Sequence, residues 1–240
     1  MHPIFVYTSG FLVLGGAGMH VANRRVDAAT SRARWLKFGT YVGIVGCAIA
    51  AIFLNRFYWL AILITTVGLW EILKNSLRVS SLSIQQSGLF GYLLIVAGFL
   101  QFVTTFDPLF ILFIYFQVFI FDGFSQVSGQ MFGTHRLLPR ISPGKTWEGL
   151  MGGSLFCLTA AIIARDWVSL SLTQALLTGL ATAALSFAGD ILASAVKRAT
   201  RIKDYSQLLP GHGGFLDRFD SFLMTGAGFF AFSYLKFLVL

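Results

Sequence analysis

The sequence predicts an all-α, polytopic integral membrane protein with about eight transmembrane helices joined by polar loops. Of its 240 residues, 56% are hydrophobic and only 12% are charged, and the mean hydropathy is +0.74. A soluble domain of this length would aggregate with so apolar a composition. The apolar residues also gather in long runs, as expected for a chain that crosses a bilayer repeatedly.

Each predicted span is an apolar run close to the length of about 20 residues that crosses the hydrocarbon. The first run has no basic segment before it and is followed by arginines. We therefore expect a retained helix with its N-terminus outside rather than a cleaved signal peptide. The eight runs are 4–22, 38–54, 57–73, 88–105, 108–121, 148–164, 172–190 and 221–239.

The basic residues are distributed unevenly between the two sets of connections. Four loops on one side hold 15 of the 18 Lys and Arg residues, and this asymmetry assigns that side to the cytoplasm. The net charge of +8 is then a topology signal and a source of attraction to anionic lipid heads, so nucleic acid is not an expected partner. The four loops are 23–37, 74–87, 122–147 and 191–220.

Polar chemistry is concentrated in the second half of the chain. Residues 1–120 are expected to form N-terminal transmembrane helices, and residues 121–240 to form a C-terminal membrane region that carries the chemistry. The two cysteines, Cys47 and Cys157, lie within apolar runs, so they are interpreted as core residues rather than as a disulfide or a metal site. Acids, bases, glycines and hydroxyls mix in 122–147 and in 190–221, where chemistry is expected.

A polar stripe follows the seventh span into the cytoplasm. Asp190, Ser194, Lys197 and Arg201 recur at i, i+4, i+7 and i+11, so they share one face of a helix that continues beyond the span. Such a stripe can simply face water. Its first member, however, is a carboxylate at the edge of the hydrocarbon, which is costly without a cation or a function.

The chain then turns and returns to the membrane with two more acids. Asp217 and Asp220 are three residues apart and share a face if the last helix has already begun. Because both helix ends meet one membrane surface, the turn should bring these acids near Asp190. Three hard oxygen donors would then converge where Mg²⁺ binds together with substrate phosphates. An exposed helix start explains the pair equally simply.

The turn itself reads "PGHGG", with glycines at Gly211, Gly213 and Gly214. Glycine backbone can approach a phosphate closely, and the intervening His212 could hydrogen-bond a phosphate or transfer a proton. A flexible turn with a solvated histidine is the alternative.

The other polar loop opens with Asp122 and offers the cations Arg136, Arg140 and Lys145 to a polyphosphate. Its "SPGKTWEG" contains GKT without the glycine spacing or the preceding strand of a P-loop, so that interpretation is rejected. Ser142 or Thr146 is a candidate cap for the sixth helix, and Glu148 lies in its first turn.

The segment "SAVKRATRIKDYSQLLPGHGGFLDRFD", from Ser194 to Asp220, resembles the signature of CDP-diacylglycerol synthases (phosphatidate cytidylyltransferases). The elements Ser-x-x-Lys-Arg, Lys-Asp and Pro-x-His-Gly-Gly-x-x-Asp-Arg-x-Asp occur in order. "RISPGKTWEG" resembles a second block of that family. With Asp122, the similarity covers about residues 120–223, whereas the N-terminal half resembles the family only as generic spans.

The resemblance implies transfer of CMP from CTP to phosphatidic acid, giving CDP-diacylglycerol and pyrophosphate in phospholipid biosynthesis. It also implies Mg²⁺, with a second cation left open, and a multi-pass protein of the bacterial cytoplasmic membrane whose active site faces the cytoplasm. The implied catalytic residues are Asp190, Lys197, His212 and Asp217, and the implied metal ligands are Asp190, Asp217 and Asp220. The implied contacts to substrate phosphates are Asp122, Ser142, Lys145, Ser194, Arg198, Lys203, Gly213, Gly214 and Arg218.

The chain departs from the family pattern in "DGFSQVSGQMFG", where Gln126 and Gln130 replace an expected tyrosine and arginine. A paralogue acting on another lipid phosphate is therefore one alternative, and a CTP-dependent lipid kinase of the polyprenol or phytol type is another. A transporter or scaffold is the third. A transporter would carry ionisable residues near the midplane and repeated halves, whereas Glu71 lies near a span end and no repeat is visible. The glycine-rich first span could form a homodimer or pack within one chain.

Overall fold

The structure is a computed structural model that describes residues 3–24, 26–76, 82–209 and 213–239. Within these residues, a long helix covers each of the eight predicted spans, and seven of the helices are long and apolar enough to cross a membrane. The protein is thus an all-α, multi-pass membrane protein, with seven candidate spans among the described residues where the sequence predicted about eight. The helices are α1 (Pro3–Asn23), α2 (Ala28–Phe53), α3 (Phe57–Ser76), α4 (Leu82–Thr105), α5 (Pro108–Phe132), α6 (Trp147–Ala164), α7 (Leu172–Ala199) and α8 (Leu216–Val239).

Helix α5 corrects the sequence prediction most clearly. The predicted span ended at residue 121, and Asp122 was expected to open a loop, but α5 continues to Phe132. The added turns carry small residues that pack closely on α6: a Cβ at Gly149 would lie 2.8 Å from the backbone oxygen of Ser125. Because this contact buries a polar stretch against another helix, the segment stays helical even though its composition is typical of a loop.

A short β-hairpin follows α5, where the sequence predicted only a loop. Strands β1 (Arg136–Leu138) and β2 (Ser142–Thr146) are antiparallel, with Arg136 paired to Thr146 and Leu138 to Ser142. A 3₁₀ turn, η1 (Arg165–Val168), follows α6. The hairpin places the "SPGKT" segment on β2, directly before the first turn of α6.

The chain divides into two compact units, each made of two separate stretches. One unit contains Met1–Cys47 and Leu112–Ala184, and the other contains Ala48–Ile111 and Leu185–Leu240. Helices α2, α5 and α7 each contribute to both units. The division into residues 1–120 and 121–240, which we expected from where polar residues are concentrated, stays a prediction.

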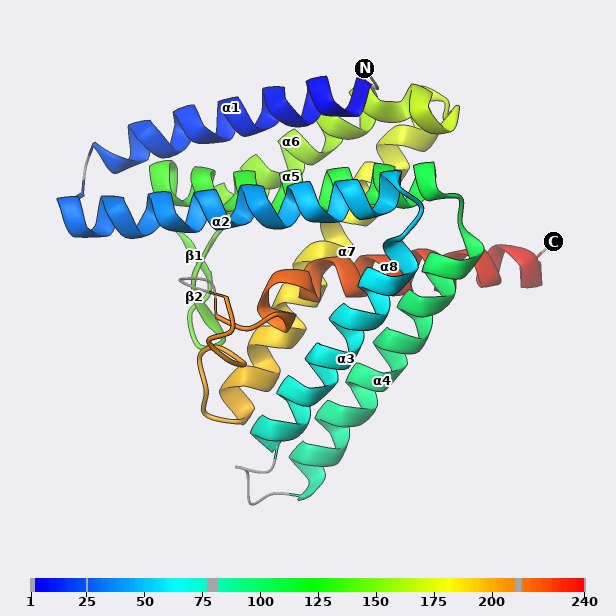
Figure 1. Cartoon of the computed structure of the whole chain (residues 1–240). Helices are drawn as coiled ribbons and strands as arrows, with labels where there is room; N and C mark the ends of the chain where they lie inside the picture. The colour runs from blue at the N-terminus through cyan, green and yellow to red at the C-terminus, as the bar shows by residue number, and fades with distance from the viewer. Residues whose placement is uncertain (1–2, 25, 77–81, 210–212, 240) are drawn as a thin grey trace. The chain divides into compact units, whose positions relative to one another are not determined.

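The second unit is built on α3, α4 and α8. Helices α3 and α4 lie side by side (Figure 1), and α4 makes the most extensive contact with α8. Aromatic rings fill the interior: the Phe222 ring lies 5.3 Å from that of Phe99 and 5.8 Å from that of Phe57. Gly98 permits close approach, since a Cβ there would lie 3.0 Å from that of Ala227. This core supports the start of α8, which carries the predicted acids.

Candidate active site

Asp217 lies in the first turn of α8 and is almost completely buried. Its Oδ1 accepts a hydrogen bond from Nζ of Lys197 at 2.5 Å, and the two side chains are 1% and 10% exposed, respectively. Its Oδ2 accepts hydrogen bonds from the backbone N–H groups of Tyr205, at 2.9 Å, and Gly214, at 2.8 Å. Each carboxylate oxygen therefore has a strong donor, as a buried charge requires.

Asp190 and Asp220 are brought together by close contact between α7 and α8. A Cβ at Gly189 would lie 2.7 Å from the backbone oxygen of Asp220, so no larger residue fits beside it. The charged side chains close enough to act on the Asp220 carboxylate are those of Asp190, Lys197 and Arg218. The predicted approach of Asp190 to the last helix is confirmed for Asp220.

The expected convergence of three acids on one point is not found. Among the described residues, no group of three His, Cys, Asp or Glu side chains is arranged to hold a metal ion. The reason is that the Asp217 carboxylate is directed at Lys197 and at two loop amides. Asp190 and Asp220 remain as the carboxylate pair.

The polar stripe on α7 is confirmed in its first turns and ends early. Ser194 Oγ donates to Asp190 Oδ1 at 3.3 Å, one helical turn away, and Lys197 continues the face to Asp217. Arg201 does not belong to the stripe, because α7 ends at Ala199 and Arg201 has a left-handed backbone with φ 56°.

The remaining predicted cations of this region lie at the surface. Arg198, Lys203 and Arg218 are exposed, and Arg198 Nη1 donates to the backbone oxygen of Ile202 at 2.8 Å. All three are therefore accessible to an anionic ligand. His212 lies outside the described residues.

The glycines of the turn make room for carboxylates. Gly213 has φ 78°, which favours glycine,. A Cβ at Gly214 would lie 2.6 Å from Oε1 of Glu71 and 3.0 Å from Oδ2 of Asp217. The sequence interpretation assigned these glycines to phosphate approach. In the structure, Gly214 is in contact with two protein carboxylates.

Glu71 of α3 was noted in the sequence as an acid near a span end but was not assigned to the site. It is fully buried, and its Oε1 accepts from Ser206 Oγ at 2.5 Å and from Phe215 N–H at 2.9 Å. Its Oε2 accepts from Leu216 N–H at 2.8 Å. The available signal was its position: an acid inside an apolar run is costly and calls for a partner.

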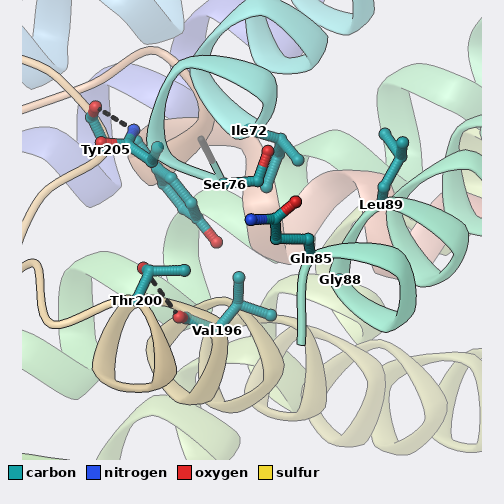
Figure 2. A pocket seen from close by; sticks show the side chains of 9 residues that line it. Ile72, Ser76, Gln85, Gly88, Leu89, Val196, Thr200 and Tyr205 are labelled. Atoms are coloured by element: carbon teal, nitrogen blue, oxygen red, sulfur yellow. Dashed lines mark hydrogen bonds between the residues drawn. The ribbon is translucent and has the colours of Figure 1, made fainter. Parts of the chain in front are cut away.

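Asn75, one turn after Glu71, provides a second attachment of α3 to the loop. Its Nδ2 donates to the backbone oxygens of Glu71 and Tyr205, both at 2.7 Å. Tyr205 lines a small cleft with side chains from α3, α4 and α7 (Figure 2), and its backbone oxygen takes one of the bonds drawn there. Its hydroxyl donates to Ala193 O at 3.2 Å. The loop base is thus held from α3 and α7.

The hairpin belongs to the other unit and carries the predicted Ser142 and Lys145, both half-buried on β2. Thr146 is the N-cap of α6, as one of the two candidates predicted: its Oγ1 accepts from Gly149 N–H at 3.1 Å. Asp122 is half-buried within α5.

Glu148 closes the hairpin rather than only facing the helix start. Its carboxylate accepts from Thr134 Oγ1 at 2.7 Å and pairs with His135 Nδ1 at 2.6 Å. It also accepts from the backbone N–H groups of both residues. The His135 side chain is 79% exposed, so an oriented imidazole lies at the surface of this unit.

Gln130 of α5 is one of the two positions where the sequence departs from the family pattern that it resembles. Its Oε1 and the Oγ of Ser125 are buried without a hydrogen-bond partner in the described part of the chain, whereas Gln126 is exposed. Replacement of an arginine at position 130 leaves a neutral side chain with an unpaired acceptor. The local chemistry of α5 is thus different from that of the pattern it resembles.

Curated proteins with similar sequences match about half of the chain. An uncharacterised Escherichia coli protein, YnbB, is 46% identical over 105 residues, which are 43% of this chain and 35% of the relative. The phosphatidate cytidylyltransferase of Haemophilus influenzae is 42% identical over 140 residues, 54% of this chain and 48% of the relative. That of Staphylococcus epidermidis is 40% identical over 133 residues, 53% and 51% respectively. The chain thus spans about half, or less, of the length of these relatives.

A sequence model described as the cytidylyltransferase family matches residues 34–236. This match includes the buried glutamate of α3 as well as the signature on α7 and α8, so the similarity extends well beyond the C-terminal half to which the motifs pointed. Asp190, Asp217 and Asp220 and the signature cations all fall within it. The chain belongs to the cytidylyltransferase family.

Proposed function

We propose that this protein transfers CMP from CTP to phosphatidic acid, releasing pyrophosphate and forming CDP-diacylglycerol. The observation that carries the proposal is the placement of Asp190 and Asp220 on closely packed helices, with Lys197 and Arg218 close enough to act on Asp220. Acids and bases at one surface of a membrane protein suit a reaction between a lipid phosphate and a nucleotide. The names of two relatives, phosphatidate cytidylyltransferase, support the same activity.

The chemistry requires no serine or cysteine nucleophile, because the phosphate of the lipid attacks the α-phosphorus of CTP. An oxygen–phosphorus bond forms as the bond to the leaving pyrophosphate breaks. The protein then has to align the two phosphates and neutralise the charge that develops on the leaving group. Lys197, Arg198, Lys203 and Arg218 would supply countercharge, and Ser194 a hydroxyl.

The Asp190 and Asp220 pair fits a hard divalent cation. Two like charges on closely packed helices repel one another, and a bound cation would offset that repulsion. Mg²⁺ is commonly held by one or two carboxylates together with substrate phosphates. When bound, it would polarise the phosphates and stabilise the leaving pyrophosphate. Asp217 was also expected to bind the metal; its bonds to Lys197 and two backbone amides support the proposal that it holds Lys197 in place.

The hairpin residues Ser142 and Lys145, together with Asp122, would contact CTP. We further propose that the loops bearing the basic residues face the cytoplasm of a bacterial cell, since the charge asymmetry follows the positive-inside rule. A homodimer through the glycines of α1 is part of the same proposal and is tested by the oligomeric state in detergent. His212 retains its proposed role in phosphate binding or proton transfer.

The deciding experiment is incubation of purified protein in lipid–detergent micelles with α-labelled CTP, Mg²⁺ and phosphatidic acid. We expect label in the organic phase and release of an equal amount of pyrophosphate. A CTP-dependent lipid kinase would instead leave the α-label in aqueous CDP and place γ-label in the lipid, so a parallel reaction with γ-labelled CTP separates the two activities. Unlabelled lipid in both reactions, with an active family member as the positive control, would refute cytidylyl transfer to phosphatidic acid.

The neutral Gln130, which leaves Oε1 unpaired, favours a second candidate acceptor. If phosphatidic acid remains unlabelled, other lipid phosphates in the same assay test whether the enzyme uses a different one. Label in another lipid would assign cytidylyl transfer with altered acceptor specificity.

A further inference from the structure

We infer that Glu71 is a positioning residue for the loop between α7 and α8, residues 200–215, which we call the signature loop. It closes the base of this loop and sets the start of α8, so that Asp220 lies opposite Asp190. The inference rests on the proposed function for its catalytic consequence. The contacts on which it rests lie within one compact unit. No part of the family resemblance that we read from the motifs included this residue.

Glu71 binds both ends of the loop at once. Ser206 Oγ, near the beginning of the loop, and the N–H groups of Phe215 and Leu216, at its end, all donate to one carboxylate. Asp217 does the same from the other side, because its Oδ2 accepts from Tyr205 N–H and Gly214 N–H. Two carboxylates therefore clamp the loop base.

The Glu71 bonds also determine where α8 begins. Leu216 is the first residue of α8, and the first N–H groups of a helix have no partner within it. A carboxylate at this end satisfies them and interacts favourably with the helix dipole. Asp217 follows one residue later and Asp220 one turn later, so a shift of this helix start would move both acids.

The ionised glutamate suits this set of donors better than glutamine would. The two amides and the hydroxyl all donate to Glu71, and a carboxylate accepts at both oxygens, whereas an amide presents a donor in place of one of them. Glu71→Gln keeps the shape of the side chain, but its amide NH₂ group would face one of the groups that donate to Glu71. Glu71→Asp keeps the charge and shortens the reach by one methylene group.

The loop could not be held in this manner with a side chain at position 214. A Cβ there would lie 2.6 Å from Glu71 Oε1 and 3.0 Å from Asp217 Oδ2. The close approach of the backbone to both acids therefore explains why glycine occupies this place in the turn. The same glycine was expected, from the sequence, to face a phosphate.

Hydrogen exchange of the substrate-free protein, followed by mass spectrometry, tests the clamp without relying on activity. In Glu71→Gln, we expect faster exchange confined to peptides covering 205–216 and loss of any protection that Mg²⁺ adds there. The matched control is Asp107→Asn, which makes the same chemical change at the start of α5, where Asp107 Oδ1 accepts from Leu109 N–H at 2.8 Å. Uniformly faster exchange throughout the protein, or unchanged exchange at 205–216, would overturn the inference.

Kinetics provide the second measurement. We expect Glu71→Gln to lower kcat about 100-fold, as displacement of catalytic groups by about 1 Å does, with little change in KM for CTP. The Mg²⁺ concentration for half-maximal activity should rise about tenfold, because groups that orient metal ligands have effects of this size. A loss of folded protein with normal kcat and normal Mg²⁺ dependence per folded molecule would assign Glu71 a merely structural role and overturn the proposal.

A double-mutant cycle with Ser206→Ala identifies the bond directly. Because Ser206 acts through Glu71, its substitution should have a much smaller effect on exchange and kcat in the Glu71→Gln background than in the wild type. Fully additive effects would contradict the contact. If wild-type protein transfers no cytidylyl group, the proposed function fails, while the exchange experiment still decides whether Glu71 holds the loop.

Discussion

At the scale of single residues, the ion pair between Lys197 and Asp217 shows that a candidate catalytic acid can also stabilise the fold. Both side chains are nearly inaccessible to water. Removal of one partner from such a pair leaves a buried charge uncompensated, which destabilises a protein by about 3–5 kcal/mol. The stability and the activity of Asp217 variants are therefore coupled.

Asp217→Asn should abolish turnover and lower the thermal unfolding midpoint in detergent, since Lys197 loses its counter-ion. The added substitution Lys197→Met should recover much of the midpoint and none of the turnover. Thermal unfolding of the two variants and of wild-type protein measures this, alongside incorporation of label from CTP. Near-normal turnover in Asp217→Asn would remove the residue from the site.

Lys145→Ala should weaken CTP binding while leaving the fold intact. The half-buried ammonium on β2 is a point charge suited to phosphate, and its loss removes that attraction without opening a core. Titration with CTP, monitored by protein fluorescence or calorimetry, measures the change. Lys74→Ala is the control, because Lys74 lies over the Trp70 ring in α3; equal CTP affinity for both variants would refute the assigned role.

At the scale of elements, the crossing of α5 and α6 depends on small residues. A Cβ at Gly153 would collide with Ser125 Oγ and lie 2.8 Å from the backbone oxygen of Phe121. Because one of these obstacles is backbone, the helices cannot relieve the clash by a rotamer change. Close glycine-mediated contact is a common way for membrane helices to associate.

Gly153→Ala should therefore separate α5 from α6 and lower stability by about 1–3 kcal/mol, the usual cost of overpacking. Gly43→Ala in α2 is a suitable control, since a Cβ there meets nothing within 4 Å, and alanine favours helix formation. Thermal unfolding in the same detergent compares the two. A Gly153→Ala variant as stable as Gly43→Ala would show that the helices do not approach this closely.

At the scale of the whole molecule, the distribution of basic residues predicts which loops share a membrane face. The exposed cations of the hairpin and of the loop after α7 belong to one set of connections, while Arg56 and Arg165 belong to the opposite set. This prediction follows from charge alone and is independent of the chemistry assigned to either loop.

Single-cysteine labelling tests the topology. In a Cys47→Ala background, which removes the exposed native cysteine, Arg140→Cys and Gln207→Cys should react with a membrane-impermeant maleimide only after cells are permeabilised. Asn55→Cys and Asp166→Cys should react in intact cells. Labelling of Arg140→Cys in intact cells would reverse the assigned orientation.

Much of the fold was accessible from apolar run length, because backbone groups in lipid must be satisfied within a helix. Each predicted span corresponds to a helix, and the extension of α7 beyond its span followed from the stripe that contains Ser194 and Lys197. The hairpin and the extension of α5 were missed. Polar composition at 122–146 is typical of a loop, whereas the close packing of residues such as Ser125 and Ser128 against α6 stabilises helix there.

The candidate site was predicted in composition and only partly in arrangement. The polar stripe identified Asp190 and the motif identified Asp217 and Asp220, but spacing along a helix does not specify which carboxylate turns towards a cation. Glu71 was unrecognised because its partners are 135 to 145 residues away in sequence. Such contacts have no local pattern.

The sequence by itself determined that the chain is a helical membrane protein. It also determined that Asp190, Asp217 and Asp220 lie where α7 leaves the membrane and α8 returns to it, and that the last two belong to a family signature. These properties depend on run length, helical period and local motif order. Only the tertiary structure decided that Asp217 pairs with Lys197, that Gly214 makes room for two carboxylates and that Glu71 holds the start of α8. The physical reason is that hydrogen bonds between distant segments depend on how buried helices pack, and packing reflects the whole chain at once.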